Sequence, residues 1–336
     1  MSSVVIAPDK FKGTASASEV SNWIEQAAIV AGYSPESIPM SDGGEGLLEA
    51  LGGMRRVVWV TSPLGKLVRA EWRISGKTAV IEMAQASGIT IVGGPERNDP
   101  LAASTRGTGE LIVAALLAGA TEIIVGCGGS ATTDGGVAAL AAMEPLERFA
   151  DIQLRALVDV DAKFLDSADL FGAQKGASPA QVVVLSKRLR EVATEFKNRF
   201  DIDVTAVEGG GAAGGLGGAL FALGAEIESG FEYVARYHGL RESIQRSRNV
   251  VTGEGRLDET SFMGKAVGSI IKMAQELGAN CLVVAGSATD LGRQMAQSLG
   301  AEVQVLPSTL ESGSLPPPTM RSLVIRCVRD WLVTVE

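Results

Sequence analysis

The stretch from residue 249 to residue 306 decides the fold class, because strand-like and helix-like segments alternate along it. Asn249-Val-Val-Thr252, Cys281-Leu-Val-Val-Ala285 and Glu302-Val-Gln-Val-Leu306 are short runs rich in β-branched residues, a pattern typical of buried strands. Helices are predicted between them, over 263–277 and 289–298. Such alternation indicates a mostly parallel sheet with helices on both faces.

The rest of the chain extends this pattern, with one change of character. Val4-Val-Ile-Ala7 predicts a buried strand, and a helix over about 18–31 follows, capped by Ser16 or Ser18. Between residues 56 and 92, alternating segments separated by Pro-Leu-Gly and Ser-Gly turns predict hairpin-like strands. Further segments are expected as helices over 108–118, 137–143 and 180–198, as strands over 122–125 and 155–161, and as a last docked element over 319–335.

Composition excludes several classes of protein. The chain has 336 residues, of which 46% are hydrophobic and 21% charged, so a globular protein of about two domains is expected. The net charge of −9 argues against a nucleic-acid partner, since phosphate backbones require clustered Lys and Arg. The sequence has no signal-peptide pattern and no long apolar span, and its three cysteines form no C-x-x-C pair. We therefore expect a cytoplasmic protein without a membrane partner.

Some familiar catalytic motifs are missing or weak. His238 is the single histidine, and its place at the end of a predicted helix is more typical of a cap than of a catalyst. There is no Walker A motif. Gly209-Gly-Gly211-Ala-Ala-Gly214 fits G-x-G-x-x-G, and residues 202–207 could form a preceding strand. We do not interpret it as a dinucleotide site, because glycine-rich tracts match this pattern by chance.

Four acidic loops, three of them glycine-rich, lie mostly near predicted strand ends: residues 41–46, 132–136, 159–161 and 253–258. One Asp-Gly loop alone is more often a turn, but four together favour a shared site. Carboxylates there could hold Mg²⁺ or take a proton from a hydroxyl. Four further loops offer cations, hydroxyls and backbone N–H groups for anions, namely residues 9–13, 104–110, 126–130 and 174–176. This combination is typical of phosphoryl transfer.

Eight motifs in a fixed order go beyond generic chemistry. They are Ala7–Thr14, Ser41–Gly46, Ala79–Gly88, Ala103–Glu110, Gly128–Gly136, Phe171–Ala177, Gly211–Gly217 and Thr252–Asp258. With these motifs the sequence resembles the bacterial glycerate kinase family, type I, from about residue 4 to residue 308. It departs from the family pattern between 137 and 170, where the chain is shorter and Ala162-Lys163-Phe164 follows Asp161 in place of Asn-Pro.

The resemblance implies ATP-dependent phosphorylation of D-glycerate to 2-phosphoglycerate, with Mg²⁺. It also implies an α/β fold of two domains: a Rossmann-like, flavodoxin-like parallel-sheet domain and an inserted mixed α/β domain. We expect the first from residues 1–60 plus 245–336, the second from 61–244, and the active site in the cleft between them.

Roles for individual residues follow from the resemblance. Asp42 or Asp134 is the expected base, and Lys12 and Arg106 are expected to hold the glycerate carboxylate or the phosphate. The remaining expected residues are Asp9, Lys10, Glu45, Thr105 and Arg256 for substrate, Gly128, Gly129, Ser130, Lys175, Gly214 and Gly215 for nucleotide, and Glu254 and Asp258 for the metal.

Two other functions stay open. The shortened 137–170 region is compatible with a non-catalytic binding or sensor protein on the same scaffold, although the retained charged motif residues speak against it. A kinase for another small hydroxy acid is also compatible. A homo-oligomer is possible, but the sequence leaves the oligomeric state undetermined, together with the position of the phosphorylated hydroxyl and any domain closure.

Overall fold

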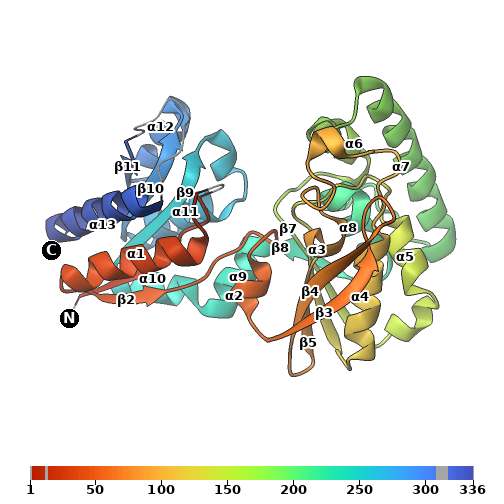
Figure 1. The fold of residues 1–336 in the computed structure, drawn as a ribbon, viewed down its shortest axis with the longest axis horizontal. Coiled ribbons are helices and arrows are strands. Elements are labelled where there is room, and N and C mark those ends of the chain that lie inside the picture. Colours follow the sequence, from red (N-terminus) through yellow and green to blue (C-terminus); the bar gives the residue numbers. More distant parts are fainter. Residues whose placement is uncertain (1, 12–13, 308–316, 336) are drawn as a thin grey trace. The chain divides into compact units, whose positions relative to one another are not determined.

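The computed structural model describes residues 2–11, 14–307 and 317–335. The chain divides into two compact units (Figure 1). The terminal unit consists of residues 1–41 and 234–336, and the middle unit consists of residues 42–233. Each unit has its own sheet, so each is described by itself.

The described part of the terminal unit contains a five-stranded parallel sheet in the order β11-β10-β9-β1-β2. The strands are β1 (Ser3–Ile6), β2 (Ser34–Ser37), β9 (Asn249–Leu257), β10 (Asn280–Ala288) and β11 (Ala301–Val305). Counted within this unit the order is 2-1-3-4-5, the flavodoxin-like arrangement. The strand order reverses between β1 and β9, and ligands in such sheets bind beyond the carboxyl ends of the strands at that point.

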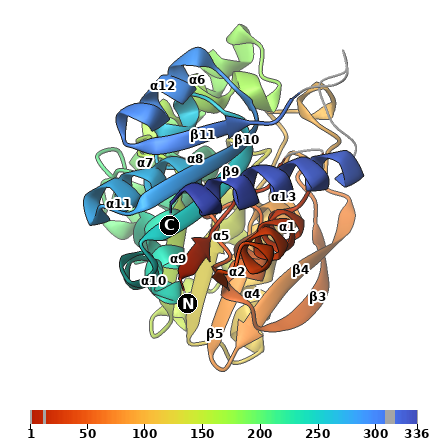
Figure 2. The ribbon, with the colours of Figure 1, turned by 90° about the vertical axis from the view of Figure 1, so that its left-hand side faces the viewer.

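Helices cover both faces of this sheet. They are α1 (Ala17–Val30), α10 (Leu240–Ser247), α11 (Ala266–Leu277), α12 (Asp290–Ser298) and α13 (Pro317–Thr334). α1 and α13 lie side by side (Figure 2) and bury Ile24 and Val328 against Val4 and Ile6 of β1. The Ser16 hydroxyl accepts a hydrogen bond from the Glu19 backbone N–H in a capping box, so Ser16, rather than Ser18, begins α1.

The described part of the middle unit contains a six-stranded mixed sheet in the order β3-β4-β5-β6-β7-β8. The strands are β3 (Met54–Thr61), β4 (Leu67–Ser75), β5 (Thr78–Glu82), β6 (Glu122–Gly126), β7 (Gln153–Val158) and β8 (Glu226–Ser229). The predicted hairpin strands are confirmed, because β3 and β5 both pair antiparallel with β4. From β5 to β8 all pairs are parallel, so the carboxyl ends of four strands share one edge.

Helices of the middle unit pack on this sheet around a core that includes Leu111, Phe164 and Phe196. They are α2 (Leu47–Leu51), α3 (Ala84–Ser87), α4 (Arg106–Leu117), α5 (Val137–Met143), α6 (Ser167–Phe171), α7 (Pro179–Phe200) and α8 (Ala212–Ala222). α9 (Gly230–His238) runs from the middle into the terminal unit, and His238 ends it. None of the helices in the described residues is both long and apolar enough to cross a membrane.

Three expectations differ from the structure. The boundary expected at residues 60 and 61 cuts through β3, which pairs over its whole length with β4, so the divisions lie at 41/42 and 233/234. Residues 202–207 form no strand, which removes the context that a dinucleotide motif needs. β2 and β8 were not predicted, because Ser-Pro-Glu-Ser and Glu-Ile-Glu-Ser lack an apolar run.

Candidate active site

The carboxyl edge of the parallel strands in the middle unit brings several glycine loops into backbone contact. The Gly128 N–H donates to the Gly43 carbonyl at 3.2 Å, and a Cβ on Gly128 would lie 2.4 Å from the Gly44 Cα. Only glycine allows backbones this close. The loop at 42–46 therefore lies directly on the loop that follows β6, although some 80 residues separate them in the sequence.

Asp42 is held at this edge with much of its carboxylate available. Its Oδ1 accepts one hydrogen bond, at 3.2 Å from the Gly44 N–H, and its side chain is partly exposed. A Cβ on Gly230, the residue that follows β8, would lie 2.3 Å from the Asp42 carbonyl carbon. Asp42 thus lies against the end of β8 with a carboxylate that can accept further hydrogen bonds.

Glu82, at the end of β5, anchors the loop that carries Asp42. Its Oε1 accepts hydrogen bonds from the backbone N–H groups of Gly46, at 2.8 Å, and Leu48, at 3.1 Å, and Gln85 Nε2 donates to its Oε2 at 3.2 Å. Burial raises the pKa of the Glu82 carboxyl above its ordinary value, and these hydrogen bonds oppose the shift. Glu82 was not among the expected site residues, although a carboxylate inside the strand Thr78-Ala-Val-Ile-Glu82 was a signal for it.

Asp134 is buried, at 6% exposure, where α4 and α5 begin. Its Oδ2 accepts hydrogen bonds from the N–H of Thr105, at 2.9 Å, and from its hydroxyl, at 2.8 Å, and its Oδ1 accepts one from the Gly136 N–H at 3.1 Å. The Thr105 hydroxyl oxygen in turn accepts a hydrogen bond from Ala139 N–H. Burial raises the pKa of the Asp134 carboxyl, against these hydrogen bonds. Asp134 therefore joins two helix N-termini, which favours a carboxylate there.

Lys175 lies in the interior next to the same loop. Its side chain is 5% exposed, and its Nζ donates to the Thr132 carbonyl at 2.8 Å. Burial lowers the pKa of Lys175 to about 8, and the nearby Asp134 opposes the shift. Asn98 adds a second link, because its Nδ2 donates to the carbonyls of Ala131, at 2.9 Å, and Lys175, at 2.8 Å.

The glycine tract also packs directly on the loop of Thr132 and Asp134. The Gly135 N–H donates to the Gly214 carbonyl at 2.9 Å. Gly214 and Gly215 have φ values of 74° and 96°, and a Cβ on Gly214 would lie 1.9 Å from the Thr132 carbonyl oxygen. These glycines therefore serve close packing between two backbones, and their expected contact with nucleotide stays a prediction.

Two of the residues expected to bind nucleotide, Gly129 and Ser130, have backbone N–H groups that are available to a ligand. The N–H groups of Gly129 and Ser130 donate to no other residue in the described part of the chain. Their loop is fixed by residues 87–89: the Ile89 N–H donates to the Gly129 carbonyl at 2.9 Å, and the Ala131 N–H donates to the Ser87 carbonyl at 2.9 Å. Unpaired N–H groups in a fixed loop can bind phosphate oxygens.

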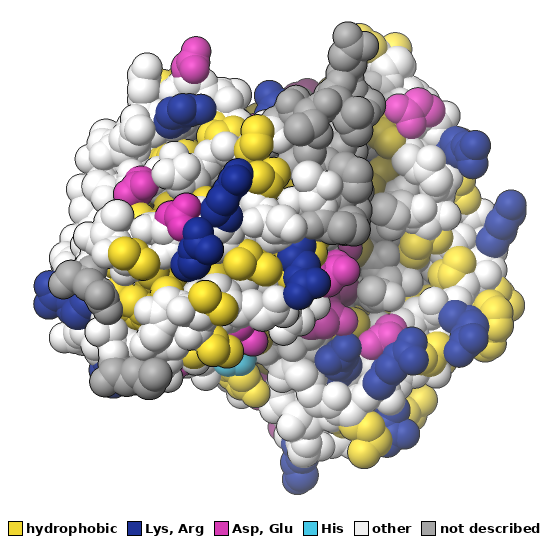
Figure 3. All heavy atoms as spheres, turned by 60° about the vertical axis from the view of Figure 1, so that its left-hand side comes forward, with side chains coloured by type: hydrophobic (Ala, Val, Ile, Leu, Met, Phe, Trp, Pro, Cys, Tyr) yellow, Lys and Arg dark blue, Asp and Glu magenta, His cyan; other side chains and the backbone are white. Residues whose placement is uncertain are grey.

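Arg106 begins α4 and is the most accessible cation among the expected residues of the middle unit. Its side chain is 56% exposed, and its Nε contacts Glu110 Oε1 at 2.9 Å. Glu110 also accepts hydrogen bonds from the N–H and hydroxyl of Thr61, so the pair is fixed to the end of β3. Glu45 is exposed on the loop of Asp42. Where exposed charge is visible in Figure 3, Lys and Arg are interspersed with Asp and Glu.

In the terminal unit, the expected residues gather where the strand order reverses. Asp9 and Lys10 follow β1, and the Asp9 N–H donates to the Gly253 carbonyl of β9 at 2.8 Å. Glu254, the next residue of β9, is 9% exposed, and its Oε1 has no hydrogen-bond partner among the residues that the structure describes. Burial raises the pKa of Glu254 to about 7, with Asp9 among the groups that add to the shift. Lys12 lies outside the described residues.

Asp258 and Arg256 bind each other and their own loop. Asp258 Oδ1 accepts hydrogen bonds from the N–H and hydroxyl of Thr260, at 3.0 and 2.6 Å, and its Oδ2 contacts Arg256 Nε at 3.3 Å. These hydrogen bonds lower the pKa of Asp258. Within the described ranges, no group of three or more His, Cys, Asp or Glu side chains could hold a metal ion.

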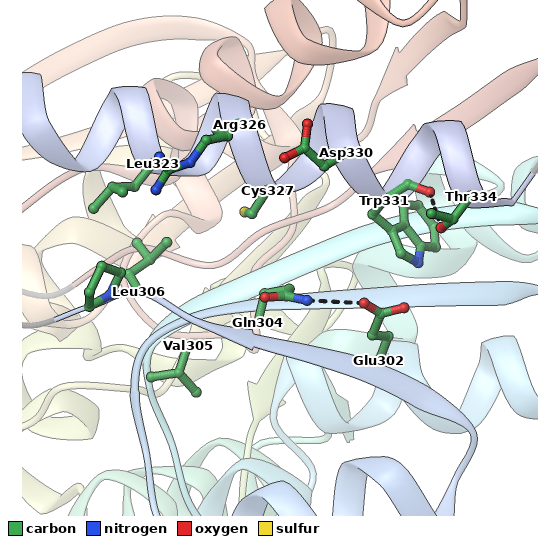
Figure 4. Close-up of a pocket in the computed structure, with 11 residues that line it drawn as sticks. Glu302, Gln304, Val305, Leu306, Leu323, Arg326, Cys327, Asp330, Trp331 and Thr334 are labelled. Carbon is green, nitrogen blue, oxygen red and sulfur yellow. Dashed lines mark hydrogen bonds between the residues drawn. The ribbon is translucent and has the colours of Figure 1, made fainter.

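The terminal unit also has a pocket between β11 and α13, with a volume of about 390 Å³ (Figure 4). Glu302 and Gln304 line it from β11, and Arg326, Asp330 and Trp331 line it from α13. None of the expected site residues that the structure describes lines this pocket. Cys327 there is a free thiol, as are Cys127 and Cys281.

Comparison with known proteins identifies the family. The model of the glycerate kinase family matches residues 4–146 and 143–314. The chain belongs to the glycerate kinase family. A glycerate 2-kinase of Escherichia coli is 42% identical over 327 aligned residues, covering 85% of this chain and 86% of that protein. A glycerate kinase of Halalkalibacterium halodurans is 35% identical, covering 98% of this chain and 99% of that protein.

A solved structure agrees with the family assignment. The crystal structure of a protein from Salmonella typhimurium LT2, provisionally described as glycerate kinase 2, has a TM-score of 0.81 and 32% identity. The match covers 100% of this chain and 98% of that one. The two stretches that match the family model meet at residues 143–146, where α5 ends and the chain leads to β7. This is within the region in which the sequence departs from the family pattern.

Proposed function

We propose that this glycerate kinase transfers the γ-phosphoryl group of ATP to the 2-hydroxyl of D-glycerate and releases ADP and 2-phosphoglycerate. Family membership supports phosphorylation of glycerate. The observation that carries the proposal is the convergence of the acidic 42–46 loop with the glycine loop after β6 at one edge of a parallel sheet. A carboxylate and free backbone N–H groups at such an edge suit transfer of an anionic group.

We assign Asp42 as the general base. Its partly exposed carboxylate accepts one hydrogen bond, whereas the buried Asp134 carboxylate accepts three and joins two helices. Asp42 takes the proton of the glycerate 2-hydroxyl. The hydroxyl oxygen of glycerate forms a bond to the γ-phosphorus of ATP while the bond between that phosphorus and the leaving oxygen of ADP breaks. Asp134 then has a positioning role at the start of α4.

The anionic groups need separate binding partners. Arg106 suits the glycerate carboxylate, because a guanidinium can donate two parallel hydrogen bonds to it. The N–H groups of Gly129 and Ser130 suit phosphate oxygens of ATP. Lys12, Asp9 and Lys10 are assigned to substrate and phosphate from the family pattern alone.

The residues of the terminal unit fit Mg²⁺ in part. Within the described part of the chain, Glu254 has a buried Oε1 without a hydrogen-bond partner, as expected of a carboxylate that binds a cation, whereas both Asp258 oxygens already have partners. Mg²⁺ commonly takes one or two protein carboxylates and completes its shell with water and phosphate oxygens. When bound it neutralises charge on the phosphate oxygens, and Glu254 is the residue that would hold it.

The test is ADP release from purified protein supplied with ATP, Mg²⁺ and D-glycerate. Coupling the product directly to enolase, without a mutase, identifies 2-phosphoglycerate because enolase uses that isomer. Turnover through enolase is the expected result. ADP release that needs a mutase for coupling would assign the 3-hydroxyl instead.

A panel of lactate, tartronate and hydroxypyruvate distinguishes the other candidates. A kinase for another hydroxy acid would prefer one of these acids, and a binding or sensor protein would bind a ligand without releasing ADP. Either result would overturn the proposed function. The cytoplasmic location and a site formed jointly by the two units stay predictions.

A further inference from the structure

Lys175 is an interior cation that ties two loops of the middle unit together. It ends the short helix η4 (Ala173–Lys175), and its ammonium reaches across to the Thr132 carbonyl. Asn98 connects the two loops a second time, because its Nδ2 donates hydrogen bonds to the backbone carbonyls of both Ala131 and Lys175. Residues 131 and 132 are thus joined to residue 175 through two independent routes.

The local backbone explains why this lysine points inward. Gly176 follows it with φ 89°, and a Cβ there would lie 2.2 Å from the Pro95 carbonyl oxygen. The chain therefore turns sharply against residues 95–98, and Lys175 is left in the interior between that segment and the loop after β6. An ammonium in such a place is retained only when it has specific partners.

We propose that Lys175 is a positioning residue for phosphoryl transfer: its buried ammonium, held by the Thr132 carbonyl beside the Asp134 carboxylate, keeps the loop at 126–136 in its active arrangement. This inference rests on the proposed function, because that loop carries the N–H groups assigned to ATP. It revises the expectation of a direct contact between Lys175 and nucleotide, since a side chain 5% exposed has little surface with which to touch a ligand.

The charge of Lys175 is part of this role. Its partners are a carbonyl dipole and one carboxylate, so loss of the proton removes the attraction to Asp134. Asp134 is the charged group that acts on the ammonium, whereas the charged side chains of the packed segments, Glu96 and Arg97 of η1 (Pro95–Arg97) and Asp169 of α6, are exposed. The pKa of about 8 places this loss within the range in which the enzyme can be assayed.

The experiment compares wild type with Lys175→Met, which keeps the length of the side chain and removes the charge. Lys187→Met on α7 is the matched control, because Lys187 is 77% exposed and lies outside the site. We expect kcat to fall at least tenfold in K175M and to stay within twofold of wild type in K187M.

The pH profile separates positioning from direct contact. Wild-type kcat and kcat/KM should both fall as pH rises through about 8, because a lysine shielded from ligand titrates alike in the free enzyme and in the complex. K175M should lack this fall between pH 7 and 9. If Lys175 contacted phosphate directly, the fall would lie at higher pH in the kcat profile and stay near pH 8 in the kcat/KM profile, and that result would overturn the proposal. A K175M variant with wild-type kcat would also overturn it.

Hydrogen exchange supplies a readout that does not depend on catalysis. At pH 7 the amides of residues 127–136 should exchange at least fivefold faster in K175M than in wild type, whereas K187M should exchange like wild type. Unchanged exchange would refute the loop-holding role even if the protein had no kinase activity. If K175M does not fold, a wild-type kcat profile that stays flat from pH 7 to 9 would refute it.

Discussion

Replacing Glu82 by Ala should destabilise the middle unit and impair catalysis together. The substitution removes the acceptor of two backbone N–H groups, at Gly46 and Leu48. A buried donor left without a partner costs about 1–3 kcal/mol. The Leu48 N–H is buried and would lose its partner completely, whereas Gly46 is partly exposed and can bind water instead. Removing the buried carboxylate also removes its own desolvation cost, which offsets part of the destabilisation. We therefore expect the free energy of unfolding to fall by about 3 kcal/mol.

Glu82→Gln is the informative companion variant. Its amide oxygen can still accept both hydrogen bonds, so the expected loss is about 1 kcal/mol at neutral pH. Burial raises the pKa of Glu82 above its ordinary value of 4.5. Above pH 4.5 the folded protein therefore keeps Glu82 protonated to a greater extent than the unfolded chain does. Wild-type stability should therefore fall relative to E82Q as pH rises above 4.5.

Urea denaturation followed by fluorescence measures these losses, with Trp59 and Trp72 reporting on the middle unit. Glu191→Ala on α7 is the control, because its carboxylate is 68% exposed and pairs with Lys187 at 3.7 Å; its loss should stay below about 0.5 kcal/mol. In E82A, kcat should also fall about tenfold, since the loop of Asp42 loses its anchor. Equal losses in E82A and E191A would refute the argument that Glu82 holds this loop.

Three further predictions test other parts of the structure. Asp42→Asn should lower kcat by at least about 100-fold with little change in Tm, and steady-state kinetics that show near wild-type kcat would remove Asp42 as the base. Gly214→Ala should prevent folding or lower the free energy of unfolding by more than about 3 kcal/mol, because its Cβ would overlap the Thr132 carbonyl. Gly32→Ala has a similar positive φ but open space around it, so the loss there should be about 1 kcal/mol. Thermal or urea unfolding of both variants, followed by circular dichroism, measures the two losses. The pKa of Lys175 is lowered to about 8, so above that pH the unfolded chain binds more protons than the folded protein. Wild-type stability should therefore rise relative to K175M by about 1 kcal/mol between pH 7 and 9, and a constant difference in urea denaturation would contradict this.

Much of the fold was predictable because its determinants are local. Ser16 and Glu19 form the capping box that begins α1, and the Ser178-Pro179 pair begins α7 close to the residue that the sequence predicts. The hairpin strands around β4 follow from turns and alternation. β2 was missed because Ser34-Pro35-Glu36-Ser37 becomes a strand only by pairing with β1 at the edge of the sheet.

The candidate site was predictable in its residues and less so in its roles. The motifs named Asp42, Asp134 and Lys175 as functional candidates, but sequence could not distinguish a partly exposed carboxylate from one that joins two helices. Glu82 was quoted within a motif and given no role, because its two N–H donors lie 36 and 34 residues away in the chain.

The sequence by itself determined most of the strands and helices, the family, and the chemical types available in each loop, because periodicity, caps and motifs depend on neighbours along the chain. Tertiary structure alone decided that β3 belongs to the middle unit, and that Lys175 is buried while Arg106 is exposed. The physical reason is that burial, hydrogen-bond partners and proton affinity are set by groups that approach from distant parts of the chain.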